Sequence, residues 1–318
     1  MSESARSPFR PRRSRRRSPA RDRLELLLFR GAVSALGFLP RGAAASLGGA
    51  LAVAYVRVAR SRRRVLIENL RAAFPGKAPE EIERLARDSM RSFGASFMDF
   101  LEISRLDEER IRSRVRVVGR EHYDRARALR RGVLLMSAHI GGWELGAMLA
   151  GILGEPIVPV VRPLDNPLLE RELVRLRTRF GNRLIAKRDA ARDILRTLRS
   201  DGVVAILIDQ NVIAREGVFV PFFGRLAATS PALALFQLKT GAPVVPVFVW
   251  PEEGGRYRVE LEPAIGAEEF QEDGAGRDEA VLRATRRYTE VTEAAIRRDP
   301  AAWLWMHNRW RTRPPRES

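Results

Sequence analysis

The chain has 318 residues, 45% of them hydrophobic, which is enough to bury a substantial core in one large domain or two small ones. Its formal net charge is +18, and only three of its 57 basic residues are lysines, so its surface should attract anionic partners such as acidic lipids, an acidic carrier protein or nucleic acid. The absence of cysteine excludes disulfide bonds, thiolate nucleophiles and cysteine-bound metal sites.

The N-terminal segment, residues 1–23, holds nine arginines among serines and prolines. Such a charge run is typical of a disordered tail. A secretory signal peptide is not indicated, because no small-residue cleavage site closes a short apolar stretch.

The next segment, residues 24–63, is apolar and rich in small residues. A spanning helix needs about 20 predominantly apolar residues, and here Arg30, Arg41 and Arg57 divide the stretch. Pro40 interrupts it further. Basic residues on both sides favour two ends that face the cytoplasm. The pattern predicts two short membrane-associated helices that lie in the membrane interface; a strained single span and an ordinary helical hairpin are the alternatives.

The remainder, residues 64–318, is the predicted catalytic domain. Residues 65–104 have apolar residues at helical spacing, with Pro79 near a helix start. Beyond them, short β-rich runs alternate with helical stretches. Strands are predicted at 133–138, 157–161, 203–208 and 243–250, with a more exposed, antiparallel candidate at 256–265, and helices at 167–180, 189–200, 230–240 and 278–298. This alternation predicts an α/β fold with a mostly parallel sheet flanked by helices.

Polar residues directly follow three of the predicted strands: His139, Arg162 and Asp209. In open parallel sheets, ligands bind outside the carboxyl ends of the strands. If these strands are neighbours, a base, a cation and a carboxylate converge on one edge of the sheet. The sequence therefore predicts a candidate site at that edge.

The stretch "HIGGWE" begins at His139 and ends at Glu144. Residues five apart on a continuous helix lie about 140° apart around its axis, so these two side chains meet only if the chain turns between them. Gly141 and Gly142 permit a sharp turn before a helix that begins near Trp143. We expect Glu144 to fold back and accept a hydrogen bond from one imidazole nitrogen, which leaves the other nitrogen as a general base.

A covalent nucleophile is not evident, because the chain has neither cysteine nor a G-x-S-x-G elbow, and this disfavours an α/β hydrolase. The base would instead activate a substrate hydroxyl that attacks an acyl donor, and backbone N–H groups or Arg162 would stabilise the negative oxygen. Neither His122 nor His307 has metal-ligand spacing to His139, so no metal is expected. We expect His122 on a surface helix and a structural role for His307. Nucleotide-binding glycine motifs are absent.

"HIGGWE" resembles the His-x4-acid motif of the glycerolipid acyltransferase superfamily, in the form found in the bacterial lipid A biosynthesis (late) acyltransferases, also called the lysophospholipid acyltransferase-like family. Other stretches resemble the same branch in the right order. They are "RVLIENLRAAFP" (64–75), "VVRPLDNPLLERELVRLRTRFG" (160–181), "LIDQN" (207–211), "VFVPFFGRLAATSPALALFQLKTGAPVVPVFV" (218–249) and "WLWMHNRWRTRP" (303–314). The resemblance covers about residues 24–314.

The resemblance implies an enzyme at the cytoplasmic face of the cell inner membrane. It would transfer an acyl chain from an acyl carrier protein or acyl-CoA to a glycolipid hydroxyl, without a metal or other cofactor. His139 carries over as general base and Glu144 as its orienting carboxylate. The implied substrate-binding residues are Arg162, Asp209 and Gln210, with Phe222, Phe223 and Gly224 of "PFFG" shaping an acyl or acceptor pocket. Gly142 departs from the family, which usually has asparagine there, and this puts the local turn geometry in question.

The expected acceptor is a lipid A precursor. The alternatives are a phosphatidylinositol mannoside, which the same family acylates in actinobacteria, or another lysolipid. A basic surface would suit an acidic carrier protein, lipid A phosphates and an anionic membrane surface. A distant alternative is a non-enzymatic protein that binds nucleic acid or membranes through the arginine tail. We expect no nucleic-acid partner, because no helix-turn-helix, zinc or RNA-recognition signature is present.

Overall fold

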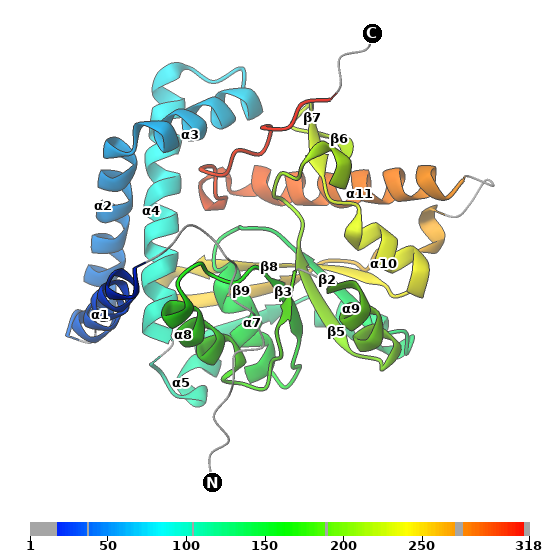
Figure 1. Ribbon diagram of the computed structural model, residues 1–318, viewed down its shortest axis with the longest axis horizontal. Coiled ribbons are helices and arrows are strands. Elements are labelled where there is room, and N and C mark those ends of the chain that lie inside the picture. The colour runs from blue at the N-terminus through cyan, green and yellow to red at the C-terminus, as the bar shows by residue number, and fades with distance from the viewer. Residues whose placement is uncertain (1–17, 37, 104, 188–189, 271–275, 315–318) are drawn as a thin grey trace.

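A computed structural model describes residues 18–314 except 37, 104, 188–189 and 271–275. Residues 1–17 of the predicted tail therefore lie outside the described part. At the centre is a seven-stranded sheet with the order β1-β9-β8-β2-β5-β3-β4 (Figure 1). The strands are β1 (Val115–Val118), β2 (Val133–Ser137), β3 (Val158–Val161), β4 (Ile185–Ala186), β5 (Val203–Leu207), β8 (Val244–Glu252) and β9 (Arg256–Leu261).

Neighbouring strands run parallel except β8 and β9, which pair antiparallel. This confirms the mostly parallel α/β sheet, including the antiparallel strand predicted over 256–265. A separate hairpin, β6 (Val218–Phe222) and β7 (Arg225–Thr229), was not predicted.

Eleven α-helices are found in the described residues. They are α1 (Pro19–Leu36), α2 (Arg41–Val58), α3 (Arg60–Ala73), α4 (Pro79–Ile103), α5 (Glu108–Arg112), α6 (Arg120–Ala128), α7 (Trp143–Ile152), α8 (Pro167–Thr178), α9 (Ala190–Arg199), α10 (Ala232–Thr240) and α11 (Arg277–Arg298). Helix α4 begins at Pro79, a residue whose fixed φ suits the first turn of a helix. The stretch predicted as helical over 65–104 falls in two helices, α3 and α4.

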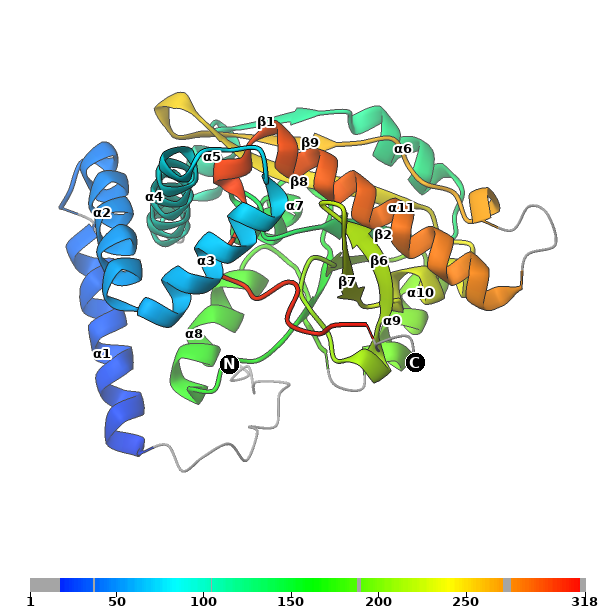
Figure 2. The same cartoon turned by 90° about the horizontal axis from the view of Figure 1, so that it is seen from above.

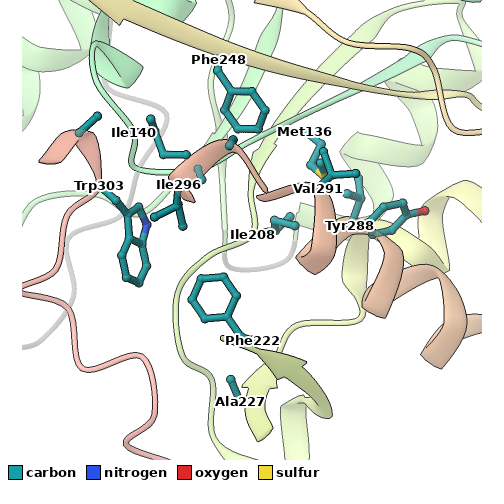
Figure 3. Close-up of a cluster of buried hydrophobic side chains, with 14 of the residues drawn as sticks. Met136, Ile140, Ile208, Phe222, Ala227, Phe248, Tyr288, Val291, Ile296 and Trp303 are labelled. Carbon is teal, nitrogen blue, oxygen red and sulfur yellow. The ribbon is translucent and has the colours of Figure 1, made fainter. Parts of the chain in front are cut away.

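One face of the sheet is filled with large side chains. Met136 of β2 and Phe248 of β8 point from this face toward Tyr288, Val291 and Ile296 of α11 (Figure 3). Helix α10 and the β6–β7 hairpin complete this layer. Helices α6 and α7 cover the opposite face. The sheet is thus sandwiched between two helical layers, as alternating strands and helices require.

The N-terminal helices stand to one side of the sheet (Figures 1 and 2). Helix α2 lies against α4 at a close crossing, where a Cβ on Gly48 would come within 2.6 Å of the carbonyl oxygen of Gly94. Arg41 at the start of α2 donates to the buried carboxylate of Asp99 on α4 at 2.8 Å. Small residues and a buried ion pair therefore fix this helix pair on the domain.

Helix α1 begins at Pro19, five residues before the start of the predicted helical segment, and packs on α8. Arg30 of α1 pairs with Glu172 of α8. Of the described helices, none is by itself long and apolar enough to cross a membrane. Helices α2 and α3 reach that length and composition only together, and the chain bends by 100° between them.

Candidate active site

A tight turn follows β2 and carries His139. Gly141 has a φ of +53°, and a Cβ there would lie 2.4 Å from the carbonyl oxygen of Val249, so this position requires glycine. The amide of Gly142 donates to that same carbonyl oxygen at 2.8 Å. Gly142 itself has a φ of −88°, a value that asparagine also adopts, so the departure from the family leaves the turn intact. Helix α7 starts at Trp143, as predicted.

Asp209 holds the imidazole of His139. The two residues follow the parallel neighbours β2 and β5. The carboxylate oxygen Oδ1 of Asp209 lies 2.8 Å from Nδ1 of His139, and Oδ2 accepts from the backbone amide of His139 at 3.0 Å. Oδ2 also accepts from the indole Nε1 of Trp303 at 2.7 Å. Both carboxylate oxygens are therefore hydrogen-bonded, in a residue only 4% exposed.

The electrostatics favour an ionised Asp209 and a basic His139. Burial raises the pKa of Asp209. His139 and the indole of Trp303 lower this pKa by a larger amount, so the net pKa is below the ordinary 3.8. Burial lowers the pKa of His139, whereas the charges of Asp209 and Glu144 raise it, and the net pKa lies above the ordinary 6.5. With Nδ1 bonded to the carboxylate, Nε2 is the nitrogen left for proton transfer.

The predicted hydrogen bond from His139 to Glu144 is wrong. Glu144 instead forms an ion pair with Arg177 of α8, whose Nη2 lies 2.7 Å and 2.8 Å from its two carboxylate oxygens. Asp209 already occupies Nδ1, and the first turn of α7 presents Glu144 to α8. The glutamate acts on the imidazole only through its charge, which contributes to the raised pKa of His139.

Arg162 follows β3, the other parallel neighbour of β5, so it lies at the predicted edge of the sheet. Its side chain is 67% exposed, and its nearest acidic partner is Asp165 at 3.9 Å. Gln210, by contrast, places its side-chain amide nitrogen 3.1 Å from Nε2 of His139. Among the hydrogen bonds of the described residues, Gln210 contacts the imidazole of His139 and Arg162 does not.

An apolar cavity of about 150 Å³ lies between α7 and the sheet. Its walls are mostly hydrocarbon, from β2, β5, β8, β9 and the face of α7 that carries Gly146, Ala147 and Ala150. Both ends of α7 line it: Glu144 stands at the end beside the catalytic turn, and Glu155 beyond the other end. The cavity therefore runs along the helix, because small residues replace the bulky ones that would fill this layer.

A polar group lines the end of the cavity beyond α7. The hydroxyl of Tyr123 donates to Glu155 at 2.9 Å, and Arg120 donates to the other carboxylate oxygen at 2.7 Å. Trp143 and the ion pair of Glu144 with Arg177 line the end beside His139. A hydrocarbon chain that lay along α7 from Trp143 would contact mostly apolar side chains until it reached Tyr123 and Glu155.

The "PFFG" residues support the site instead of lining this cavity. Phe223 and Gly224 have φ values of 51° and 71° and form the two-residue turn between β6 and β7, where both positions need a positive φ. Phe222 is buried, with its ring 5.5 Å from that of Trp303 (Figure 3). The predicted pocket role for these three residues is therefore not seen; Phe222 packs behind the indole that binds Asp209.

The C-terminal segment completes the site and was not predicted to do so. Trp303 forms an antiparallel bridge with Ile140 and reaches Asp209 with its indole. The ring nitrogen Nε2 of His307 accepts from the backbone amide of Asn211 at 2.9 Å, and burial lowers the pKa of His307 to about 4, so this histidine is neutral and structural. The sequence indicated this tryptophan-rich segment only through its resemblance to the family, and predicted no contact between Trp303 and Asp209.

His122 lies on α6, as predicted, with a side chain that is 24% exposed. Within the described ranges, no group of three or more histidine, aspartate or glutamate residues is arranged to hold a metal ion.

Comparison of the sequence with known proteins places this chain among acyltransferases. The sequence model of the family described as bacterial lipid A biosynthesis acyltransferase matches residues 15–312. A lipid A biosynthesis acyltransferase of Haemophilus influenzae is 28% identical, over 87% of this chain and 85% of that protein. The lipid A biosynthesis palmitoleoyltransferase of Escherichia coli is also 28% identical, over 81% of each chain. A solved structure, the 1-acyl-sn-glycerophosphate acyltransferase of Thermotoga maritima, has 14% identity and a TM-score of 0.33, over 78% of this chain and 96% of that one.

Proposed function

The chain belongs to the family of bacterial lipid A biosynthesis acyltransferases, and we propose that it moves a fatty acyl chain from a thioester to a hydroxyl of a lipid A precursor, with His139 as general base. The observation that carries this proposal is the bond of 2.8 Å between Nδ1 of His139 and Asp209, with the His139 ring 5.4 Å from that of Trp143, which lines one end of an apolar cavity. It combines a base of fixed orientation with space for hydrocarbon. We place the mouth of the cavity at the end that Trp143 lines.

In the proposed reaction, the acceptor hydroxyl binds at Nε2 of His139. Its O–H bond breaks, the proton moves to Nε2, and the oxygen attacks the thioester carbon while the carbonyl π pair moves onto the carbonyl oxygen. The tetrahedral adduct then collapses, the C–S bond breaks, and the leaving thiolate takes the proton from Nε2. Asp209 stabilises the imidazolium that exists between the two proton transfers.

The cavity is the proposed place for the acyl chain. Helix α7 has ten residues, which at about 1.5 Å per residue is roughly 15 Å, a length that suits a saturated chain of medium length. Gly146 and Ala150 leave room along this path, and the Tyr123–Glu155 pair ends it. The thioester carbon would then remain outside the mouth, beside His139.

Glu144 has a different role from the one the motif predicts. We propose that its ion pair with Arg177 shapes the cavity mouth, and that its charge adds to the stabilisation of protonated His139. Asp209, which the motif assigns to substrate binding, is the orienting carboxylate.

Membrane association is proposed from the surface of the N-terminal helices. Exposed large apolar side chains are concentrated on α1, α2 and the loop between them: Leu24, Leu27, Leu28, Phe38, Leu39, Leu47, Leu51, Tyr55 and Val58. An apolar surface of this kind flanked by arginines suits a helix pair lying in the interface of an anionic membrane. The proposed location is the cytoplasmic face of the inner membrane, where an acidic carrier protein or acyl-CoA can reach the site.

The test is acyl transfer by the purified protein. An acyl carrier protein thioester or acyl-CoA is supplied with a lipid A precursor, or with a phosphatidylinositol mannoside in a parallel reaction, and lipids are analysed by mass spectrometry. We expect the lipid A precursor to gain the mass of one acyl chain, and His139→Ala to lower the rate by at least about 10³-fold. Equal rates for His139→Ala and wild type would refute the proposed mechanism.

A further inference from the structure

Gln210 covers the nitrogen that the reaction needs. Its amide nitrogen lies 3.1 Å from Nε2 of His139, and its side chain is exposed. Since Nδ1 of His139 donates to Asp209, Nε2 carries the lone pair and the amide of Gln210 donates to it. An acceptor hydroxyl can reach Nε2 only by displacing this amide. The displaced N–H group then lies beside the reacting oxygen.

The backbone on both sides of Gln210 is held in place. Asp209 is bonded to His139 and Trp303. The amide of Asn211 donates to His307, and its side chain exchanges hydrogen bonds of 3.0 Å and 3.1 Å with Thr312. The backbone of Gln210 is therefore fixed while its exposed amide can turn about the side-chain torsions.

Four backbone amides in and after the turn that follows β2 are not available to a developing oxyanion. The amides of Ile140, Gly141, Gly142 and Leu145 already donate to backbone carbonyls, at distances from 2.8 Å to 2.9 Å. These four amides are thus committed to holding the turn. Arg162, the other donor considered from the sequence, is 67% exposed and is directed to Asp165. Gln210 is the side chain whose N–H group lies against Nε2 of His139.

We propose that Gln210 is a catalytic residue that donates a hydrogen bond to the carbonyl oxygen of the thioester as this oxygen becomes negative. The proposal rests on the proposed acyl transfer at His139. When the acceptor oxygen loses its proton to Nε2 and bonds to the thioester carbon, the π pair moves to the carbonyl oxygen, and the amide N–H of Gln210 stabilises that charge. When the C–S bond breaks, the pair returns to the carbonyl and the amide closes again over Nε2.

The test compares Gln210→Ala and Gln210→Glu with wild type in steady-state kinetics of acyl transfer. Loss of one oxyanion donor costs about 10²-fold or more in kcat, and we expect this loss in both variants with the KM of the thioester unchanged. Gln210→Glu also places a negative charge beside Nε2, which raises the pKa of His139. The acidic limb of its kcat/KM profile should therefore move to higher pH. Both variants should unfold at the wild-type temperature, because the side chain is exposed.

Glu216→Ala is the matched control, because Glu216 lies on the same loop with a side chain that is 60% exposed. We expect wild-type kinetics for it. If Gln210→Ala keeps its kcat, or changes only the KM of the acceptor, the proposal is overturned while the role of His139 stands. If His139→Ala remains active, the proposed function fails first, and the two failures are distinguished.

Discussion

The two faces of the central sheet differ in how tightly they are packed. On the face under α11, large side chains such as Phe248 and Trp303 fill the space, and the indole N–H of Trp303 donates to Asp209. On the face under α7, residues as small as Gly146 and Ala150 leave a cavity. One face therefore holds the His139–Asp209 pair rigidly, and the other leaves room for the acyl chain of the proposed reaction. Close packing behind a site and space in front of it are both needed for catalysis by positioning.

The two carboxylates near His139 repeat this contrast. Asp209 belongs to the packed face, is 4% exposed and has a hydrogen bond at every carboxylate oxygen. Glu144 belongs to the cavity face, has a side chain that is 32% exposed and pairs with Arg177. The structure thus separates the group that orients the imidazole from the group that borders the substrate space.

The largest expected effect distinguishes these carboxylates. Asp209→Asn should lower kcat by about 10³-fold or more, because the amide no longer fixes the tautomer or stabilises the imidazolium. Glu144→Gln should reduce kcat by a factor at least ten times smaller than Asp209→Asn does, because Glu144 contributes charge without a hydrogen bond to the ring. Initial rates of acyl transfer measure both. A larger loss for Glu144→Gln would reverse the assignment.

The next effect concerns the cavity. Ala150→Val and Ala150→Phe should shorten the path for the acyl chain in steps, and each methylene that no longer fits costs about 1–3 kcal/mol of transition-state binding. For the proposed thioester donors, we expect kcat/KM to fall for long acyl chains while short ones retain the wild-type value. Competition between donors of different chain length measures this. An unchanged preference in Ala150→Phe would place the acyl chain elsewhere.

The pH dependence follows from the pKa of His139, which lies above the ordinary 6.5. The general base must be neutral, so kcat/KM should be lost as the pH falls through this raised pKa, and should be full above it. Asp209→Asn removes the main charge that raises the pKa, so its residual activity should persist to lower pH. A midpoint that stays the same in this variant would contradict the electrostatic role of Asp209.

A smaller effect concerns the support behind Asp209. Trp303→Phe keeps an aromatic ring of smaller size and removes the indole N–H that donates at 2.7 Å. The loss of one hydrogen bond to a buried carboxylate should lower the free energy of unfolding by about 1–3 kcal/mol. Chemical denaturation measures this change. Stability equal to wild type would show that this bond contributes little.

The smallest effect on chemistry concerns the membrane surface. Leu27→Glu and Leu51→Glu place charges on side chains that are 65% and 54% exposed. We expect less cosedimentation with anionic vesicles and an unchanged rate with a detergent-dispersed acceptor. Leu282→Glu on α11, at a site 36% exposed, is the matched control. Equal cosedimentation of all three variants with wild type would refute the interfacial role of α1 and α2.

The strands and helices around the site follow from local pattern, and the catalytic pairing does not. Short apolar, β-rich runs located β2 and β5, and paired glycines located the turn that starts at His139, because these are local signals. The partner of His139 is 70 residues away in the sequence, and only the packing of β2 beside β5 brings it close. The motif instead favoured Glu144, whose nearness along the chain does not determine where α7 directs its side chain.

The β6–β7 hairpin was missed for a related reason. Its two-residue turn contains Phe223 with a φ of 51°, a conformation that phenylalanine rarely adopts, so no turn signal marks it. Contacts outside the hairpin stabilise this turn: the amide of Phe223 donates to Glu293 at 2.5 Å, and Arg297 stacks over its ring. Tertiary contacts therefore stabilise a turn that local sequence preference does not predict.

The most direct test of the account is the tautomer of His139, measured by ¹⁵N NMR of the imidazole in wild type, Asp209→Asn and Glu144→Gln. The account predicts a proton on Nδ1 and a free Nε2 in the neutral imidazole of wild type and Glu144→Gln, and loss of this preference in Asp209→Asn. A tautomer that is unaffected by Asp209→Asn but changed by Glu144→Gln would contradict it.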